Sequence, residues 1–251
     1  MEESYYKKYF VLEKEHWFFR VRKKILFYFI KKYAKFGSKV FDFGCGSGYL
    51  VGELQKMGYD ASGTDVSTEA IEFGLSKGVR NLSAVQDGEI KPLEGGFDLI
   101  LALDVVEHME DDSRAIRAIE GALKPGGIAI ITVPAYQWMW GVQDDVNHHF
   151  RRYTMSSLVE VIKGANNFKI IRKTYFNTFL FLPIAIVRII SKWLNLKGRE
   201  SDFEIDNQIL SALFYFIFNL ETRLLKFISF PFGVSILVVL EKTKLSHEQK
   251  I

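Results

Sequence analysis

A glycine-rich turn at residues 44–48 carries the strongest chemical signal in the sequence. The apolar segment Lys39–Phe43 runs into Gly44-Cys45-Gly46-Ser47-Gly48, and a helix is expected to begin near Tyr49. Glycine lacks Cβ and tolerates positive φ, so the backbone can turn sharply and approach a ligand closely. The following helix N-terminus adds unpaired N–H donors. Such a loop is typical of nucleotide binding, but Asp42 before it and the absence of a lysine favour a ligand with an ammonium group over a pyrophosphate.

Two polar clusters have the residue types needed for proton transfer. Asp104, Glu107 and His108 follow an apolar segment at 97–103, and a second cluster at 144–153 contains His149. The second cluster is richer in histidine, aspartate and arginine than a short connection requires, which suggests function. We predict that His149 or His108 acts as a general base. The alternative is that Glu107-His108 only begins a helix and packs against a ligand.

The second cluster ends in Arg151-Arg152-Tyr153, which is predicted to bind an anionic group of a second ligand. A guanidinium pairs readily with a phosphate or a carboxylate. The alternative is that one of the two arginines forms an ion pair with Asp144 or Asp145.

Alternating strand and helix signals predict the elements that position these residues. Helices are expected at Thr68–Lys77 and Asp112–Leu123, and the second ends in a Lys-Pro-Gly-Gly turn. Strands alternating with helices favour an α/β fold with a doubly wound, mostly parallel sheet. Two late strands are expected to close it as an antiparallel edge. The expected strands are Lys39–Phe43, Asp60–Thr64, Asn81–Val85, Phe97–Leu103, Gly127–Val133, Phe168–Tyr175 and Val234–Glu241.

Further ligand-binding residues are expected at the ends of the next strands. Asp65, with Val66 beside it, stands about 20 residues past the glycine loop, where a carboxylate can accept hydrogen bonds from a ribose. Its alternative role is to cap the helix that follows. Asp87-Gly88 follows the third expected strand and could contact a base, or simply form a turn. Leu103 ends the fourth strand and is expected to offer backbone groups.

The ordered motifs across residues 38–133 resemble those of class I S-adenosylmethionine-dependent methyltransferases. The match comprises Asp42-x-Gly44-x-Gly46-x-Gly48, Asp65, Asp87 and the Lys-Pro-Gly-Gly segment before the fifth strand. The resemblance implies S-adenosyl-L-methionine as cofactor and a seven-stranded Rossmann-like sheet. The first half of the chain looks like the ubiquinone-type O-methyltransferases. There an arginine on an N-terminal helix clamps the methionine carboxylate, and Arg22 or Arg20 would match it.

The same resemblance raises the question of a metal ion. Ubiquinone-type O-methyltransferases and small-RNA terminal 2′-O-methyltransferases have an acidic-x-x-Glu-His motif that holds a divalent metal. Asp104, Glu107, His108 and His149 could form a similar site that lowers the pKa of a hydroxyl group. Asp104 stands where those families have glutamate, so the carboxylate arm is shorter. We therefore expect no metal, and keep this set as the alternative.

Composition narrows the classes of protein further. The 251 residues are 48% hydrophobic and 25% charged, and the net charge of +3 gives no reason to expect nucleic-acid binding. The single cysteine, Cys45, excludes an internal disulfide and suggests a reducing compartment. No signal peptide is visible, and the longest apolar stretch is shorter than the roughly 20 residues that span a bilayer. We expect a cytoplasmic protein that at most lies against a membrane surface.

An aromatic-rich helical insertion is expected at about 177–230, between the last two strands. We expect an N-terminal helical segment at 1–36 and a methyltransferase domain at 37–251 that includes this insertion. The insertion could serve as a lid over the acceptor, a homodimer interface or a membrane-facing surface. It leads us to predict O-methylation of a small, hydrophobic or lipid- or saccharide-linked acceptor. The alternatives are an N- or C-methyltransferase, a nucleic-acid methyltransferase, and a non-catalytic cofactor-binding assembly subunit.

Overall fold

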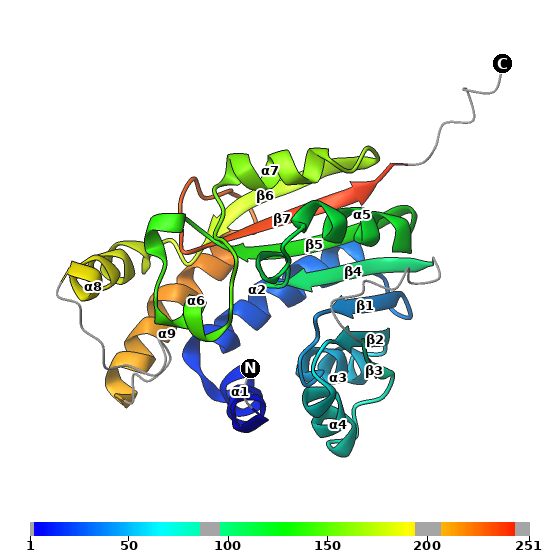
Figure 1. Ribbon diagram of the computed structural model, residues 1–251, viewed down its shortest axis with the longest axis horizontal. Coiled ribbons are helices and arrows are strands. Elements are labelled where there is room, and N and C mark those ends of the chain that lie inside the picture. The colour runs from blue at the N-terminus through cyan, green and yellow to red at the C-terminus, as the bar shows by residue number, and fades with distance from the viewer. Residues whose placement is uncertain (1–2, 86–95, 194–206, 244–251) are drawn as a thin grey trace.

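A single mixed sheet forms the centre of the molecule (Figure 1). The computed structural model describes residues 3–85, 96–193 and 207–243, and within them seven strands pair in the order β3-β2-β1-β4-β5-β7-β6. Strands β1 to β5 are parallel, and β7 runs antiparallel to both β5 and β6. The doubly wound fold class predicted from the sequence is confirmed. The strands are β1 (Lys39–Phe43), β2 (Asp60–Asp65), β3 (Leu82–Ala84), β4 (Phe97–Leu103), β5 (Leu123–Pro134), β6 (Phe168–Phe176) and β7 (Ser235–Lys242).

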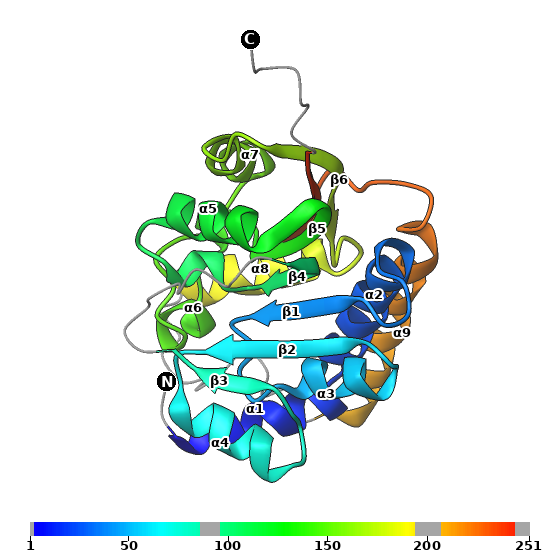
Figure 2. The same ribbon diagram turned by 90° about the vertical axis from the view of Figure 1, so that its right-hand side faces the viewer.

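Helices cover both faces of this sheet, which explains the long apolar runs in β4, β5 and β7. Helices α5 and α7 pack together on one face, and α2 and α9 pack together on the other (Figures 1 and 2). Strand β7 is buried from Ile236 to Leu240, as expected for a strand covered on both sides. The helices are α1 (Glu3–Glu15), α2 (Trp17–Tyr33), α3 (Tyr49–Lys56), α4 (Thr68–Ser76), α5 (Asp112–Ala122), α6 (Val142–Val146), α7 (Met155–Lys163), α8 (Phe181–Trp193) and α9 (Gln208–Leu224), with single 3-10 turns η1 (Val106–His108) and η2 (Gln137–Met139).

The Lys-Pro-Gly-Gly segment lies within β5 rather than before it. Phe97 of β4 pairs with Leu123, whereas Leu99 pairs with Ile128, so the residues between bulge out of the ladder. Gly126 adopts a positive φ of 82° in this bulge, a conformation that glycine accepts without steric cost. The turn predicted from the sequence is therefore present, but as an irregularity inside a longer strand.

The strand order fixes where a ligand can bind. The order reverses between β1 and β4, and ligands of open α/β sheets bind at such a switch point beyond the carboxyl ends of the strands. Strands β1, β2 and β4 end on the side of the sheet where α6 lies (Figure 2). The glycine loop and both polar clusters therefore meet at one edge.

The helices between β6 and β7 are the main elaboration of the sheet. Helix α9 lies along α2, where the ring of Phe18 stacks on that of Phe218 at 5.8 Å and Trp17 contacts Phe214 at 5.4 Å. Among the residues that the structure describes, no helix combines the length and the apolar character needed to cross a membrane.

Candidate active site

One large cavity opens at the switch point of the sheet. Its volume is about 1170 Å³, somewhat more than the roughly 300–1,000 Å³ of typical small-molecule sites. Its walls come from the glycine loop, the ends of β2 and β4, η1, the 143–150 segment and helices α1, α2, α8 and α9. The cavity therefore has room for two ligands side by side. The residues predicted for the cofactor that line it are Arg22, Asp42, Gly44, Gly46, Asp65, Val66 and Leu103.

The glycine loop adopts the conformation that the sequence predicted for it. Gly44, Gly46 and Gly48 all have positive φ. A Cβ at Gly44 would lie 2.4 Å from Cγ2 of Val105, whereas one at Gly46 would meet no atom within 4 Å. Gly44 is therefore needed for packing against the segment after β4. Gly46 keeps the cavity wall free of a side chain, which allows a ligand to approach the backbone.

Asp65 is held at the end of β2 by two backbone donors. Its Oδ2 accepts a hydrogen bond from the N–H of Gly46 at 2.7 Å, and its Oδ1 accepts one from Ser67 at 3.0 Å. Ser67, and not Asp65, caps helix α4, because its hydroxyl accepts from the N–H of Ala70. Each carboxylate oxygen keeps a second lone pair, so Asp65 can still accept the two hydroxyls of a ribose.

Asp42 lies deep in the cavity with only 4% of its surface exposed. Burial raises the pKa of its carboxyl to about 7, Arg22 opposes that shift, and Asp65 adds to it. Glu13 of α1 also lines the cavity, together with Asp104 and Glu107. The carboxyl groups outnumber the nearby cations, so the cavity suits a positively charged ligand.

Arg22 occupies a different position from the one expected of a simple carboxylate clamp. Its Nη2 lies 2.7 Å from Oδ2 of Asp104 and donates to the hydroxyl of Thr132 at 3.0 Å. Its Nε is buried and has no partner among the described residues. Arg22 thus anchors Asp104 on the wall of the cavity. Asp87 and Gly88 lie outside the described residues, and Gly48 does not line the cavity.

The predicted acidic and histidine cluster divides into two groups. Asp104, at a φ of 58°, accepts from Thr132 at 2.9 Å and pairs with Arg22, so its carboxylate is engaged away from the histidines. Glu107 is fully buried, and neither of its carboxylate oxygens has a partner among the described residues. Burial raises the pKa of Glu107 well above its usual range, and Asp104 raises it further.

His108 and His149 meet beside Glu107. Their rings are 4.5 Å apart in an edge-to-face contact. Burial, and then His149, lower the pKa of His108 to about 4, so its imidazole is neutral near neutral pH. One ligand atom each from Glu107, His108 and His149 lies within 4.8 Å of the others. A carboxylate and two imidazoles suit a divalent ion such as Zn²⁺ or Mn²⁺, and Asp104 is not part of this group.

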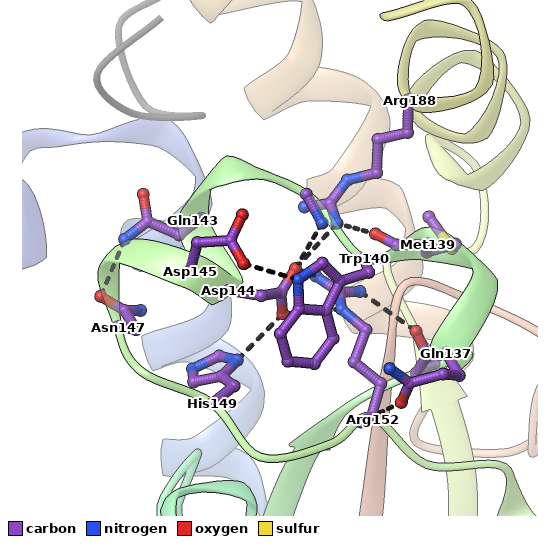
Figure 3. Close-up of polar contacts among 12 residues, drawn as sticks. Gln137, Met139, Trp140, Gln143, Asp144, Asp145, Asn147, His149, Arg152 and Arg188 are labelled. Carbon is purple, nitrogen blue, oxygen red and sulfur yellow. Dashed lines mark hydrogen bonds and ion pairs between the residues drawn. The ribbon is translucent and has the colours of Figure 1, made fainter. Parts of the chain in front are cut away.

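Asp144 is the residue on which the second cluster is organised (Figure 3). It is fully buried. Its oxygens accept from Nε and Nη2 of Arg152 at 2.7 and 2.9 Å, and from the N–H of Gly141 at 2.7 Å. Nδ1 of His149 lies 2.9 Å from Oδ1. Burial alone would raise the pKa of Asp144, but the hydrogen bonds from His149 and Arg152 hold it well below its usual range.

Arg188 of α8 reaches the same carboxylate from the helical insertion. Its Nη1 donates to the carbonyl of Met139 and lies 3.5 Å from Oδ2 of Asp144 (Figure 3). A Cβ at Gly141 would lie 3.2 Å from that guanidinium. The glycine therefore leaves the space that Arg188 occupies.

The prediction that Arg151, Arg152 and Tyr153 bind an anionic acceptor does not fit their surroundings. The guanidinium of Arg152 donates to both carboxylate oxygens of Asp144 and to the carbonyl of Ala135. Arg151 pairs with Asp112 at 3.1 Å, and the buried hydroxyl of Tyr153 donates to the same aspartate at 2.9 Å. Neither Arg151 nor Tyr153 lines the cavity. The alternative, an arginine paired with Asp144, is what the structure contains.

Sequence reasoning missed several residues of the cavity wall. Asp144 was considered only as a partner for an arginine, although its place in a loop rich in histidine and arginine was the available signal. Glu13, Trp17 and Phe214 also line the cavity. Nothing in their local sequence distinguishes them from ordinary residues of amphipathic helices, because only the tertiary packing of α1, α2 and α9 brings them to the cavity.

Comparison with known proteins identifies the class. The sequence profile of the methyltransferase domain family matches residues 14–173. The ubiquinone biosynthesis O-methyltransferase of Methylococcus capsulatus is 34% identical over 99 residues, which make up 36% of this chain and 41% of the relative. The enzyme of the same name from Pectobacterium carotovorum is 29% identical over 118 residues, 43% of this chain and 48% of the relative. The chain thus spans less than half of the curated relatives it matches.

Solved structures support the same fold. A methyltransferase from Archaeoglobus fulgidus aligns with a TM-score of 0.56 at 17% identity, over 93% of this chain and 99% of that one. A TehB-like methyltransferase from Corynebacterium glutamicum aligns with a TM-score of 0.51 at 20% identity, over 88% and 87%. The chain belongs to the methyltransferase domain family. Its seven-stranded sheet has the fold of class I S-adenosylmethionine-dependent methyltransferases, which the glycine loop and the alternation of strands and helices predicted.

The buried carboxyl of Asp42 generates a pH-dependent prediction. A bound ammonium group favours the ionised carboxyl, so S-adenosylhomocysteine affinity is expected to fall as the pH drops through about 7, by up to about tenfold per pH unit. Because folding raises this pKa, Asp42 costs stability above its unfolded-state pKa, and most of that cost is present above pH 7. Asp42→Asn should therefore weaken binding at pH 8, flatten the pH dependence and raise the Tm of the ligand-free protein.

Calorimetric titrations and thermal melts between pH 5.5 and 8.5 measure both effects. Asp60→Asn, at the exposed start of the neighbouring strand, is the matched control and should change neither. Equal affinity of the wild type and Asp42→Asn for S-adenosylhomocysteine at every pH would contradict the role given to Asp42.

Proposed function

We propose that this methyltransferase transfers a methyl group to a hydroxyl of a small, hydrophobic or lipid- or saccharide-linked acceptor. The observation that carries the proposal is the Asp144–His149 pair on the wall of the cofactor cavity. The Nδ1–H of His149 donates to Asp144, which leaves Nε2 as the nitrogen that can take a proton. Methylation of a hydroxyl requires removal of its proton, and such a base can accept it, whereas N- and C-methylation can proceed without a base. The curated relatives are themselves named as O-methyltransferases.

The chain's own residues supply position and proton transfer. When bound, S-adenosyl-L-methionine supplies an activated methyl group on a cationic sulfur. Asp42 would hold the ammonium group of the cofactor and Asp65 its ribose. The backbone of the glycine loop would approach the cofactor closely. His149 would accept the hydroxyl proton at Nε2 as the acceptor oxygen bonds to the methyl carbon. Asp144 keeps the imidazole in the required tautomer and stabilises the imidazolium that forms.

One part of the cavity, which we call the apolar limb, is lined by apolar side chains and supports the proposal of a hydrophobic or lipid-linked acceptor. Beyond the histidines, the cavity is lined by Leu180, Pro183, Ile184, Val187, Phe214 and Trp17. These side chains come from α2 and from the segment between β6 and β7, which contains α8 and α9. They would hold a hydrocarbon portion of the acceptor, because burial of apolar surface is the main favourable term in binding such a group.

A second candidate mechanism uses a divalent ion. The unpartnered carboxyl of Glu107, together with His108 and His149, offers three donor atoms. Asp144 would then orient a metal-bound histidine, as second-shell carboxylates do. The ion would lower the pKa of the acceptor hydroxyl, and no separate base would be required.

A screen with labelled S-adenosylmethionine against lipid, glycan and RNA fractions tests the acceptor class. The proposal predicts label in the lipid or glycan fraction, in a methyl ether linkage. Label in RNA would instead support a nucleic-acid methyltransferase. Absence of label in every fraction, with cofactor binding intact, would support a non-catalytic subunit.

His149→Ala is expected to lower kcat by about 10²- to 10⁴-fold, the range typical of a lost general base. It leaves the Asp144–Arg152 ion pair in place, so S-adenosylhomocysteine affinity and Tm should change little. Asp145→Asn is the control, because Asp145 is exposed and its carboxylate accepts a hydrogen bond from Nε1 of Trp140 at 2.8 Å, away from His149. Full activity of His149→Ala would contradict the role of His149 as general base and would favour an N- or C-methyltransferase.

A chelator distinguishes the general-base mechanism from the metal-ion mechanism. If His149 alone removes the proton, EDTA leaves the rate unchanged, and Glu107→Gln keeps activity and binds no less Mn²⁺ than the wild type. A rate that EDTA abolishes and Mn²⁺ restores, together with calorimetric Mn²⁺ binding that Glu107→Gln removes, would establish the metal mechanism instead.

A further inference from the structure

The outer side of α9 carries a stripe of large apolar side chains that face solvent. Their spacing of three or four residues places them on one side of the helix, and they extend over about 25 Å at 1.5 Å per residue. Ile209 is 82% exposed and Phe216 61%. The stripe consists of Ile209, Leu213, Phe216, Leu220 and Leu224, with Phe227 just beyond the helix.

Helix α8 repeats this pattern, and the two helices project from the same end of the molecule (Figure 1). Trp193 at the end of α8 is 86% exposed. Exposed apolar surface on this scale is unusual for a chain that stands alone in water. The exposed apolar residues of α8 that do not line the cavity are Leu182, Ile186, Ile189, Ile190 and Trp193.

On the described residues of α2, α8 and α9, the exposed charges beside this surface are all positive. Helices α2 and α8 contain no aspartate or glutamate, and the single acid of α9, Glu221, is fully buried. Arg223 and Lys226 are exposed beside the stripe. From α2, Nζ of Lys24 donates to the hydroxyl of Tyr215 at 2.6 Å, and the guanidinium of Arg20 lies 4.7 Å from the same ring. These contacts fix two further cations along α9.

Exposed apolar side chains next to cations fit an anionic lipid bilayer better than a second copy of this chain. In a symmetric dimer the same patch would meet itself, and the cations would face one another with no exposed carboxylate on these helices to pair with. An anionic bilayer offers hydrocarbon for the apolar stripe and negative headgroups for the cations. Lysine and arginine side chains also reach outward from such a surface to the headgroups.

The same helices separate this surface from the cavity. Ile184 and Val187 of α8 and Phe214 of α9 line the apolar limb, while their neighbours on each helix face outward. A molecule that leaves a bilayer at α8 and α9 would therefore need to pass only one layer of side chains to reach the histidines.

We propose that the exposed apolar faces of α8 and α9, with Arg20, Lys24, Arg223 and Lys226 beside them, dock on the surface of an anionic lipid bilayer. The helices lie in the interface and do not cross it. The docked protein takes its acceptor from the bilayer through the α8–α9 side of the cavity, and this last step rests on the proposed function.

Vesicle flotation tests the docking. The wild type should float with phosphatidylcholine vesicles that contain phosphatidylglycerol, and much less with phosphatidylcholine alone. Arg223→Gln with Lys226→Gln should lower the partition coefficient by roughly 25-fold, at about fivefold for each cation. Phe216→Asp with Phe227→Asp should abolish flotation. High salt should weaken binding of the wild type.

Two controls match these variants on other surfaces. Lys163→Gln with Lys169→Gln removes two exposed cations on the α7 and β6 side, and Leu75→Asp places a charge on the exposed side of α4. Both should float as the wild type does. S-adenosylhomocysteine affinity, measured by calorimetry, should be equal in all variants and shows that each is folded.

Failure of the wild type to float with anionic vesicles, or flotation of the Phe216→Asp and Phe227→Asp double variant, would overturn the proposal. Light scattering that shows a wild-type dimer, dissociated by these substitutions, with no flotation would assign the surface to a second copy. Flotation does not depend on methyl transfer. Normal flotation of a protein that methylates nothing would therefore count against the proposed function alone.

Discussion

The candidate active site depends on the buried carboxylate of Asp144. A carboxylate withdrawn from water is costly unless it is paired and hydrogen-bonded, and here Arg152, His149 and the N–H of Gly141 meet that requirement. These bonds fold the 141–153 segment back on itself and aim His149 at the cavity. Arg188 adds a contact from α8, so the helices that wall the acceptor side are joined to the same carboxylate. Loss of Arg152 would leave a buried charge unpaired, and we regard that ion pair as the support of the whole loop.

The sheet supplies the second constraint, because parallel strands bring distant segments to one edge. Gly44 packs against Val105, so the glycine loop and the 104–108 cluster are in direct contact. A substitution that shifts one of these segments would therefore shift the other. Arg22 crosses from α2 to Asp104 and ties the N-terminal helices to the end of β4. The cofactor end of the cavity is therefore held by side-chain contacts between distant segments, whereas the acceptor end is built from helices whose outer faces are exposed.

The sequence predicted the features that are local. The glycine loop, the end of β2 with Asp65, and the alternation of strands and helices depend on neighbours within a few dozen residues, and the fold class followed from them. The side-chain partners could not be predicted, because they depend on tertiary packing. Asp104 was expected among the histidines but pairs with Arg22 from α2. Arg152 was expected to bind a ligand but neutralises Asp144. The apolar limb appears only when α9 lies along α2.

The tautomer of His149 tests the central claim most directly. Long-range ¹H–¹⁵N correlation spectra of protein labelled at its five histidines, with His149→Ala for assignment, report which ring nitrogen carries the proton. The account predicts that Nδ1 of His149 is protonated and Nε2 is not, and that Asp144→Asn disturbs this state while Asp145→Asn does not. A His149 ring protonated at Nε2 in the wild type near neutral pH would contradict it, because that nitrogen could not then accept a proton from the acceptor.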